Sequence, residues 1–242
     1  MASPKPKVTV RRIVDKPRRK RNLIRFILFW IVALVLGFYT CCCVALVALK
    51  WINPPTTAVQ IQRRIEAFVH KRPYHKRYVF VPLSRISKDL QHAVLASEDE
   101  RFYQHHGIDW TELRKAVDRD LDRGKLGRGA STVTQQLVKN LFLTTSRSVI
   151  RKAVEFPLAS VADFILGKQR VLELYLNVIE WGPGVYGAEA ASQVWYGKPA
   201  VRVGREEAAR LAALIPSPLR RKPARMNAYS GIILKRMAQT GW

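Results

Sequence analysis

The chain has 242 residues, a length typical of one or two domains, and 48% of them are hydrophobic, which excludes a disordered protein. Its 42 Lys and Arg residues outnumber 18 Asp and Glu, for a net charge of +24. This excess excludes an ordinary acidic cytosolic enzyme and predicts an anionic partner, such as nucleic acid, a phospholipid surface or a phosphorylated substrate.

The N-terminal segment predicts a membrane anchor. Residues 1–25 hold ten bases and one acid, whereas residues 26–49 hold no charged side chain. At 1.5 Å per residue this apolar run would be about 36 Å long, enough to cross a hydrocarbon core of about 30 Å. It is too long for the apolar part of a signal peptide. The basic arm predicts a cytoplasmic N-terminus and an exported remainder.

The three cysteines, Cys41, Cys42 and Cys43, are consecutive and lie within the apolar run. A disulfide framework or a zinc site needs spaced cysteines, so we expect neither. We interpret the three as small residues of a lipid-facing helix, with acylation as the alternative.

The exported part keeps a strong positive charge. Residues 50–242 carry 32 bases and 17 acids, a net charge of +15. Because nucleic acid is scarce outside the membrane, we expect no nucleic acid partner. Anionic lipid headgroups or a lipid-linked phosphate fit this charge better.

The exported part is predicted to be mainly α. A linker, 50–76, contains an amphipathic helix over 59–70, and a domain follows over 77–242 with an extended segment at 77–83. Glycine-rich loops are expected at 123–131 and 181–187. Asp109 and Ser131 are the expected N-caps of two helices. The helical pattern recurs over 86–97, 109–122, 131–142, 147–166, 168–181, 187–196, 205–215 and 228–238.

The first polar cluster ends an apolar helix. Glu98, Asp99 and Glu100 place three carboxylates together, so we expect one to have a raised pKa and to serve as a general base. A solvated helix end is the plainer interpretation of the same pattern. The adjacent His105 and His106 point apart and lack a third ligand at suitable spacing, so a metal site is not expected there.

A second polar cluster follows the first. On a helix, Ser131, Gln135 and Lys139 recur at intervals of four, beside a second row of Gln136 and Asn140. This amide-rich face with one cation suits sugar hydroxyls and a phosphate.

In the third cluster, Arg147, Arg151 and Glu155 repeat the same spacing, with Lys152 beside them. A surface ion pair would give the same pattern.

Five sequence motifs lie in order between about residues 80 and 220: EDERFYQHHG, GASTVTQQLVKN, RKAVE, KQRVLELYLN and GPGVYGAEAASQVWYGK. Together they resemble, in the same order, the motifs of the peptidoglycan glycosyltransferases, found in bifunctional penicillin-binding proteins and in single-domain monofunctional enzymes. Departures from the family's usual residues occur at Val171, Asp163 and Trp195-Tyr196, and bear mainly on packing and on the groove.

The resemblance implies a lysozyme-like fold with a large head and a small membrane-associated jaw between Asp122 and Arg151. It also implies polymerisation of lipid II into β-1,4-linked glycan strands. The donor would be the nascent strand on undecaprenyl pyrophosphate, and the acceptor hydroxyl of lipid II would displace the pyrophosphate with inversion. The protein would cross the cell inner membrane once, with a cytoplasmic N-terminus and a periplasmic catalytic domain. Protein partners would come from cell wall synthesis.

The resemblance also implies residue roles. Glu98 would be the general base, and Glu155 would assist at the donor or hold a divalent cation, Mg²⁺ or Mn²⁺; no tightly bound cofactor is expected. Lys139 and Arg147 would offset the charge of the departing pyrophosphate. The other motif residues expected to bind substrate are Asp99, Phe102, His105, Ser131, Thr132, Gln135, Gln136, Asn140, Arg151 and Lys152.

Two other functions compete with this interpretation. A lysozyme-like hydrolase or lytic transglycosylase would act on the same polymer, but its acid would face a neutral bond and would need few cations. The basic row Lys139, Arg147, Arg151 and Lys152 argues against it. The second competitor is a membrane-anchored binding module without catalysis.

Overall fold

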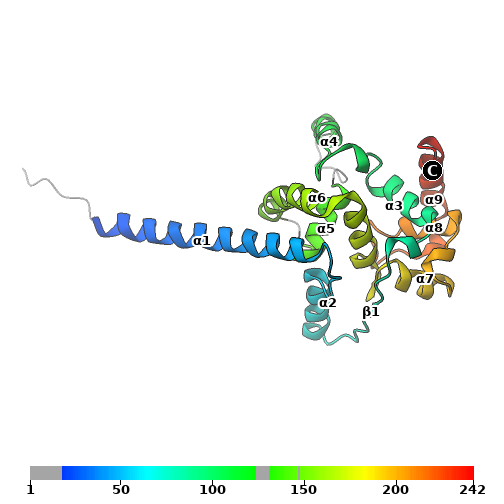
Figure 1. The fold of residues 1–242 in the computed structure, drawn as a ribbon, viewed down its shortest axis with the longest axis horizontal. Coiled ribbons are helices and arrows are strands. Elements are labelled where there is room, and N and C mark those ends of the chain that lie inside the picture. Colours follow the sequence, from blue (N-terminus) through cyan, green and yellow to red (C-terminus); the bar gives the residue numbers. More distant parts are fainter. Residues whose placement is uncertain (1–17, 124–130, 147) are drawn as a thin grey trace, which may run out of the picture. The chain divides into compact units, whose positions relative to one another are not determined.

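The computed structural model describes residues 18–123, 131–146 and 148–242. Its first helix, α1 (Arg18–Ala48), contains one stretch, Asn22–Ala48, that is long and apolar enough to cross a membrane, with a mean hydropathy of 2.6. The chain divides at Cys41/Cys42 into two units (Figure 1). Helix α1 covers nearly all of the apolar run predicted over 26–49. Its apolar side chains are largely exposed.

The second unit is mainly α, as predicted. Over its described residues, four short 3₁₀ helices connect the longer elements, at Leu83–Arg85, Phe102–Gln104, Ala200–Arg202 and Pro223–Arg225. Within the described residues its helices are α2 (Ala58–Val69), α3 (Lys88–Glu98), α4 (Trp110–Arg123), α5 (Val133–Phe142), α6 (Val149–Val178), α7 (Ala188–Tyr196), α8 (Arg205–Ala212) and α9 (Asn227–Gln239).

Helix α6 contains the break that the sequence predicts between two helices. Gly167 has a φ of 72° and a ψ of 160°, so the halves before and after it are separate helical runs. A residue with a side chain would be strained at this positive φ, which explains the glycine. The second half ends at Val178 rather than at the predicted residue 181, because the chain there enters a strand.

A small sheet replaces the loop predicted over 181–187. Strands β2 (Glu180–Gly182) and β3 (Val185–Tyr186) pair antiparallel, and β1 (Arg77–Tyr78) pairs parallel to β3 on its other side. Gly184, with a φ of 72°, lies so close to the backbone of His75 that an added Cβ would be 2.5 Å from the His75 carbonyl oxygen. The turn therefore needs glycine for close approach. Strands of two or three residues are too short to show an alternating pattern in the sequence.

The extended segment predicted over 77–83 is a strand only at its first two residues. Beyond them the Asn177 side chain holds the backbone of Val81, accepting from its N at 2.9 Å and donating to its O at 2.9 Å. An amide side chain thus satisfies backbone groups that a longer strand would have paired.

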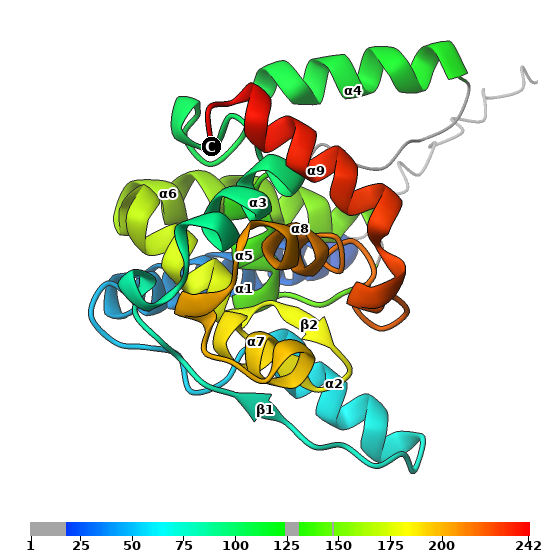
Figure 2. The ribbon, with the colours of Figure 1, turned by 90° about the vertical axis from the view of Figure 1, so that its right-hand side faces the viewer.

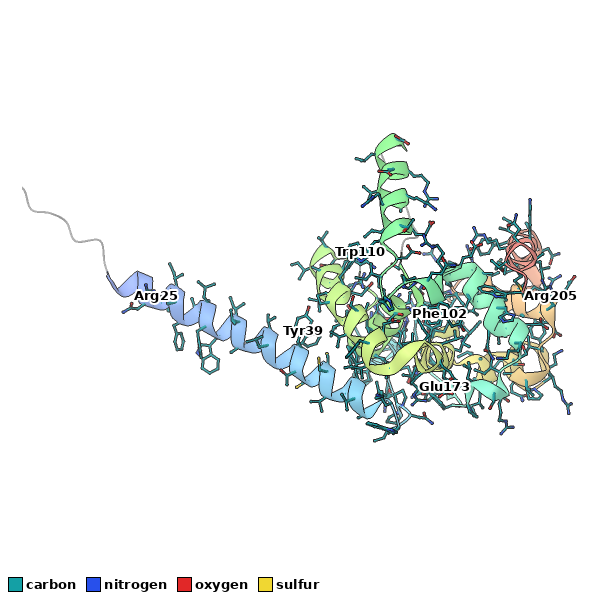
Figure 3. The ribbon with its side chains drawn as sticks, turned by 45° about the horizontal axis from the view of Figure 1, so that its top comes forward. Arg25, Tyr39, Phe102, Trp110, Glu173 and Arg205 are labelled. Atoms are coloured by element: carbon teal, nitrogen blue, oxygen red, sulfur yellow. The ribbon has the colours of Figure 1, made fainter. Side chains whose placement is uncertain are left out.

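The core lies where α5 packs on α6 and where α3 packs on α8 and α9 (Figure 2). Its largest fully buried side chains are Trp181, Tyr175, Tyr186 and Phe102. Figure 3 shows Phe102 within the helical domain and Trp110 at the start of α4. This packing brings the end of α3 beside the first turns of α5. The predicted jaw includes residues 124–130, outside the described residues, so it and the domain boundaries stay predictions.

Candidate active site

Glu98 is the last residue of α3 and the centre of the candidate site. Ser87 caps the start of this helix, and the residues between Leu90 and Ala96 bury one face of it. The Glu98 carboxylate is half-buried and accepts hydrogen bonds from Gln136 Nε2 at 2.7 Å and from Ser97 Oγ at 3.3 Å. Burial raises the pKa of Glu98, although both hydrogen bonds and the charge of Lys139 oppose this shift. The carboxylate is therefore a stronger base than an exposed glutamate.

Gln136 on α5 connects Glu98 to Tyr175 on α6. The Tyr175 hydroxyl donates to Gln136 Oε1 at 3.0 Å, which leaves the amide nitrogen facing Glu98. Tyr175 is fully buried, and this burial raises its pKa well above the usual value, with the charges of Glu98 and Asp99 adding to the effect. The phenol thus stays protonated and fixes the orientation of the amide.

Asp99 and His105 form a buried pair next to Glu98. His105 Nε2 lies 3.0 and 3.1 Å from the two Asp99 oxygens, and the backbone N of Val133 donates to Asp99 Oδ2 at 2.9 Å. The expected substrate contacts of Asp99 and His105 stay predictions, and Asp99 also lines a cavity next to Glu98. Both side chains connect the end of α3 to the first turn of α5.

The N-cap of α5 is Thr132 and not the predicted Ser131. Thr132 Oγ1 accepts from the backbone N of Gln135 at 3.1 Å, and Gln135 Oε1 accepts from the backbone N of Thr132 at 3.0 Å. Thr132 Oγ1 also donates to the carbonyl of Gly107 at 2.6 Å. Both side chains are buried in this reciprocal cap and hold the helix start, and Thr132 also lines a cavity beside Glu98, so their expected substrate contacts stay predictions.

Phe102, expected to contact substrate, lies in the core. Its ring is fully buried, with Lys168 Nζ at 4.6 Å from the ring centroid. The motif residue therefore packs the segment after α3 and does not line an open surface.

Glu155 lies on α6 in an ion cluster. Its carboxylate is buried and pairs with Arg151 and with Lys152, whose Nζ is 2.6 Å from Oε1. Lys152 Nζ also donates to Ser131 Oγ at 2.8 Å. In the residues that the structure describes, no three His, Cys, Asp or Glu side chains come together as metal ligands. Since cations already occupy both carboxylate oxygens, these residues do not fit the divalent cation expected at Glu155.

The charge of the Lys139 amine interacts with the carboxylates of both Glu98 and Glu155. Burial lowers the pKa of this half-buried amine, while the charges of Glu155 and Glu98 raise it. Asn140 donates from Nδ2 to the backbone O of Gln136 at 2.8 Å, so its amide is partly used within α5. Arg147 lies outside the described residues.

Two open cavities adjoin the Glu98–Gln136 pair. One, of about 490 Å³, is lined by Glu98, Glu100 and Ser131, and by Arg236 from α9. The other, of about 410 Å³, is lined by a different group: Gln136, Lys139, Asn140, Arg63 and Arg220. The Glu98 carboxylate thus faces one cavity, and the half-buried amine of Lys139 faces the other.

Sequence reasoning missed three side chains near these cavities. Arg236 lies in the first one and donates to the backbone O of Ala96 at 3.3 Å, and Arg220 and Arg63 lie in the second. Arginines are frequent in this chain, so no sequence signal sets these three apart.

A family model described as transglycosylase matches residues 63–238. Three relatives called biosynthetic peptidoglycan transglycosylase are similar over most of their length. The protein from Shewanella amazonensis is 43% identical over 216 residues, 88% of this chain and 87% of that protein. The protein from Herminiimonas arsenicoxydans is 42% identical over 193 residues, 77% and 84% of the two chains. The protein from Janthinobacterium sp. (strain Marseille) is 37% identical over 228 residues, 89% and 97% of the two chains.

The chain belongs to the transglycosylase family. It is an enzyme, a peptidoglycan glycosyltransferase of cell wall synthesis. The resemblance seen in the five motifs is thereby confirmed, and the hydrolase alternative is not favoured.

Proposed function

We propose that the enzyme polymerises lipid II, with Glu98 as the general base. The observation that carries this assignment is the half-buried Glu98 carboxylate, whose burial raises its pKa. In the proposed step Glu98 takes the proton of the acceptor hydroxyl, and the hydroxyl oxygen bonds to the anomeric carbon of the donor. The bond from that carbon to the pyrophosphate breaks, and its electron pair leaves with the undecaprenyl pyrophosphate. Attack opposite the leaving group gives the β-1,4 linkage with inversion.

We infer that Lys139 stabilises the departing pyrophosphate. Its amine is largely desolvated beside Gln136, and a preorganised cation in such a place is worth far more than one in water. Arg147 keeps its proposed role at the same leaving group. The acceptor would then occupy the cavity beside Glu98, and the donor the cavity beside Lys139.

We propose that Glu155 positions cations and does not take part in proton transfer. It holds Arg151 and Lys152, and Lys152 in turn reaches Ser131 beside the Glu98 cavity. A hydrolase would instead place its second carboxylate at the sugar ring. The ion cluster supports transfer from a phosphorylated donor over hydrolysis of a neutral bond.

We propose that α1 crosses the inner membrane, with the N-terminus in the cytoplasm and the catalytic domain in the periplasm. The support is the apolar length of α1 and the ten bases within residues 1–25. In intact spheroplasts, protease should remove a tag at Trp242 and spare one at Met1. Removal of the Met1 tag with a protected Trp242 tag would show the reverse orientation.

The experiment that tests the proposed reaction is incubation of the full-length enzyme with purified lipid II. We expect long glycan strands and release of undecaprenyl pyrophosphate. The same enzyme with preformed glycan should release no fragments. Cleavage of that glycan without growth of strands from lipid II would identify a hydrolase or lytic enzyme instead.

A further inference from the structure

Helix α2 carries an apolar stripe on its outward face. Ile61, Ile65, Phe68 and Val69 are 48%, 56%, 85% and 66% exposed, and their spacing of four, three and one residues places them along one side of the helix. α2 lies at the edge of its unit (Figures 1 and 2). An exposed group of four large apolar side chains is a feature of an interaction surface.

The opposite face of α2 already attaches the helix to the domain. Val59 and Gln60 are buried, and Arg63 Nε donates to Glu180 Oε2 of β2 at 3.0 Å. Tyr74, just after the helix, donates to the hydroxyl of Tyr186 at 3.2 Å. The contacts that hold α2 to the domain thus lie on the face opposite the α2 apolar stripe.

The charge around the stripe is positive. Glu66 is the one acid between residues 58 and 77, and it pairs with Arg63 at 2.8 Å. The exposed bases of this stretch are Arg64, Lys71, Arg72, Lys76 and Arg77. An apolar stripe flanked by exposed bases is what an interfacial helix presents to an anionic bilayer.

The chain between α1 and α2 is held firmly to the domain. Arg170 on α6 donates from Nε to Leu49 O at 2.8 Å and from Nη2 to Ile52 O at 3.0 Å and Asn53 Oδ1 at 2.9 Å. The Tyr78 hydroxyl donates to Pro54 O at 2.7 Å. α2 thus starts at Ala58 from a fixed point close to the end of the apolar run.

Chain length limits how far α2 can lie from a bilayer that α1 spans. Eight residues separate Leu49 from Ala58, and a fully extended connection of that length covers roughly 30 Å. The turns recorded at Lys50, Trp51 and Ile52 shorten it further. The start of α2 is therefore kept near the headgroup region.

We propose that the α2 apolar stripe lies in the interfacial region of an anionic lipid bilayer, with Arg64, Lys71 and Arg72 at the headgroups. This inference rests on the proposed function in one respect, the crossing of the membrane by α1. The domain then has two attachments to one bilayer, the transmembrane helix and α2. Two attachments fix the orientation of the catalytic domain toward lipid-linked substrates.

The experiment places a membrane-sensitive fluorophore on the full-length chain. In a background with Cys41, Cys42 and Cys43 replaced by alanine, Phe68→Cys is labelled with nitrobenzoxadiazole. The protein is placed in nanodiscs of phosphatidylcholine and phosphatidylglycerol, one copy per disc. Separate discs contain lipid with a nitroxide on a shallow acyl carbon, for Phe68, Ile65 and Val201, or on a deep acyl carbon, for Leu36 near the middle of the span. Val201→Cys, on an exposed apolar residue outside α2, is the matched control, and Leu36→Cys reports on the transmembrane helix.

Phe68 should lose roughly half or more of its emission to the nitroxide lipid, while Val201 loses little. Ile65→Cys should behave as Phe68 does. Equal quenching at Phe68 and Val201, with Leu36 strongly quenched, would overturn the α2 proposal alone. A blue-shifted but unquenched Phe68 label would also overturn it, because protein rather than lipid would then cover the stripe. An unquenched Leu36 label would instead refute the transmembrane placement of α1.

Discussion

The side-chain amide of Gln136 donates a hydrogen bond of 2.7 Å to the carboxylate of Glu98, across the boundary between α5 and α3. The Tyr175 hydroxyl holds the other end of the same amide at 3.0 Å. Gln136 was expected to bind substrate, yet its amide is engaged by two protein groups. We therefore infer that Gln136 positions Glu98 and adjusts its basicity.

Gln136→Leu should move the acid limb of the rate–pH profile to higher pH. Burial raises the pKa of Glu98, and the hydrogen bond from Gln136 lowers it again. Without that bond the pKa rises further, so Glu98 is protonated, and inactive as a base, over a wider acid range. Ser97→Ala removes the longer of the two bonds and should give a smaller shift in the same direction. An unchanged acid limb in Gln136→Leu would argue against this role, provided kcat is measured at saturating lipid II.

Glu98→Gln should raise the melting temperature at neutral pH. Because the folded-state pKa of Glu98 is raised, its charged form destabilises the fold, and this cost grows as pH rises through that pKa. Glutamine carries no such charge. Below the ordinary pKa of glutamate the two proteins should melt together. Melting curves across this pH range would contradict the account if the variant were less stable at neutral pH.

Thr132→Ala should cost about 1 to 2 kcal/mol of stability, because it removes the N-cap of α5. Ser131→Ala is the neighbouring control, since the Ser131 hydroxyl contacts Lys152 and caps nothing in α5. Chemical denaturation should separate the two variants. Equal losses would mean that the helix starts one residue earlier than described.

Asp99→Asn should destabilise the fold by about 1.5 to 3 kcal/mol, the usual worth of hydrogen bonds to a charged group. Its carboxylate forms a hydrogen bond with His105 and accepts another from the backbone N of Val133. The predicted loss would appear as a lower denaturation midpoint with an unchanged slope. A variant as stable as the parent would contradict this structural role of Asp99.

Chelation should leave the polymerisation rate within about twofold, because Arg151 and Lys152 already bind the oxygens of Glu155. Glu155→Gln should slow the reaction by freeing both cations, and added Mg²⁺ or Mn²⁺ should not restore the rate. A large loss of wild-type activity in EDTA, restored by either metal, would show that a cation acts at this site after all.

Patterns that depend on local spacing were predictable from the sequence. The apolar run of α1, the break at Gly167 and most helix limits follow from periodicity and from single special residues. The hairpin of β2 and β3 was missed because its strands are two or three residues long, and their pairing is set by close approach at Gly184.

The candidate site was only partly predictable. Glu98, Lys139 and Glu155 follow from the motifs, and the structure places Lys139 within electrostatic reach of both glutamates. Burial was not predictable, because a motif shows which polar residues matter but not which face inward. The motifs therefore did not predict the hydrogen bonds that Asp99, Thr132 and Gln135 make within the protein.

The most direct test of the central claim is steady-state polymerisation of lipid II by Glu98→Gln, with lipid II binding measured separately on the folded variant. If Glu98 takes the proton of the acceptor hydroxyl, turnover should fall by about 10²-fold or more while lipid II binding is retained. Asn140→Ala, on α5 in the cavity beside Lys139, gives a comparison at a residue with no proposed proton transfer. A Glu98→Gln enzyme that polymerises at a near wild-type rate would contradict the account.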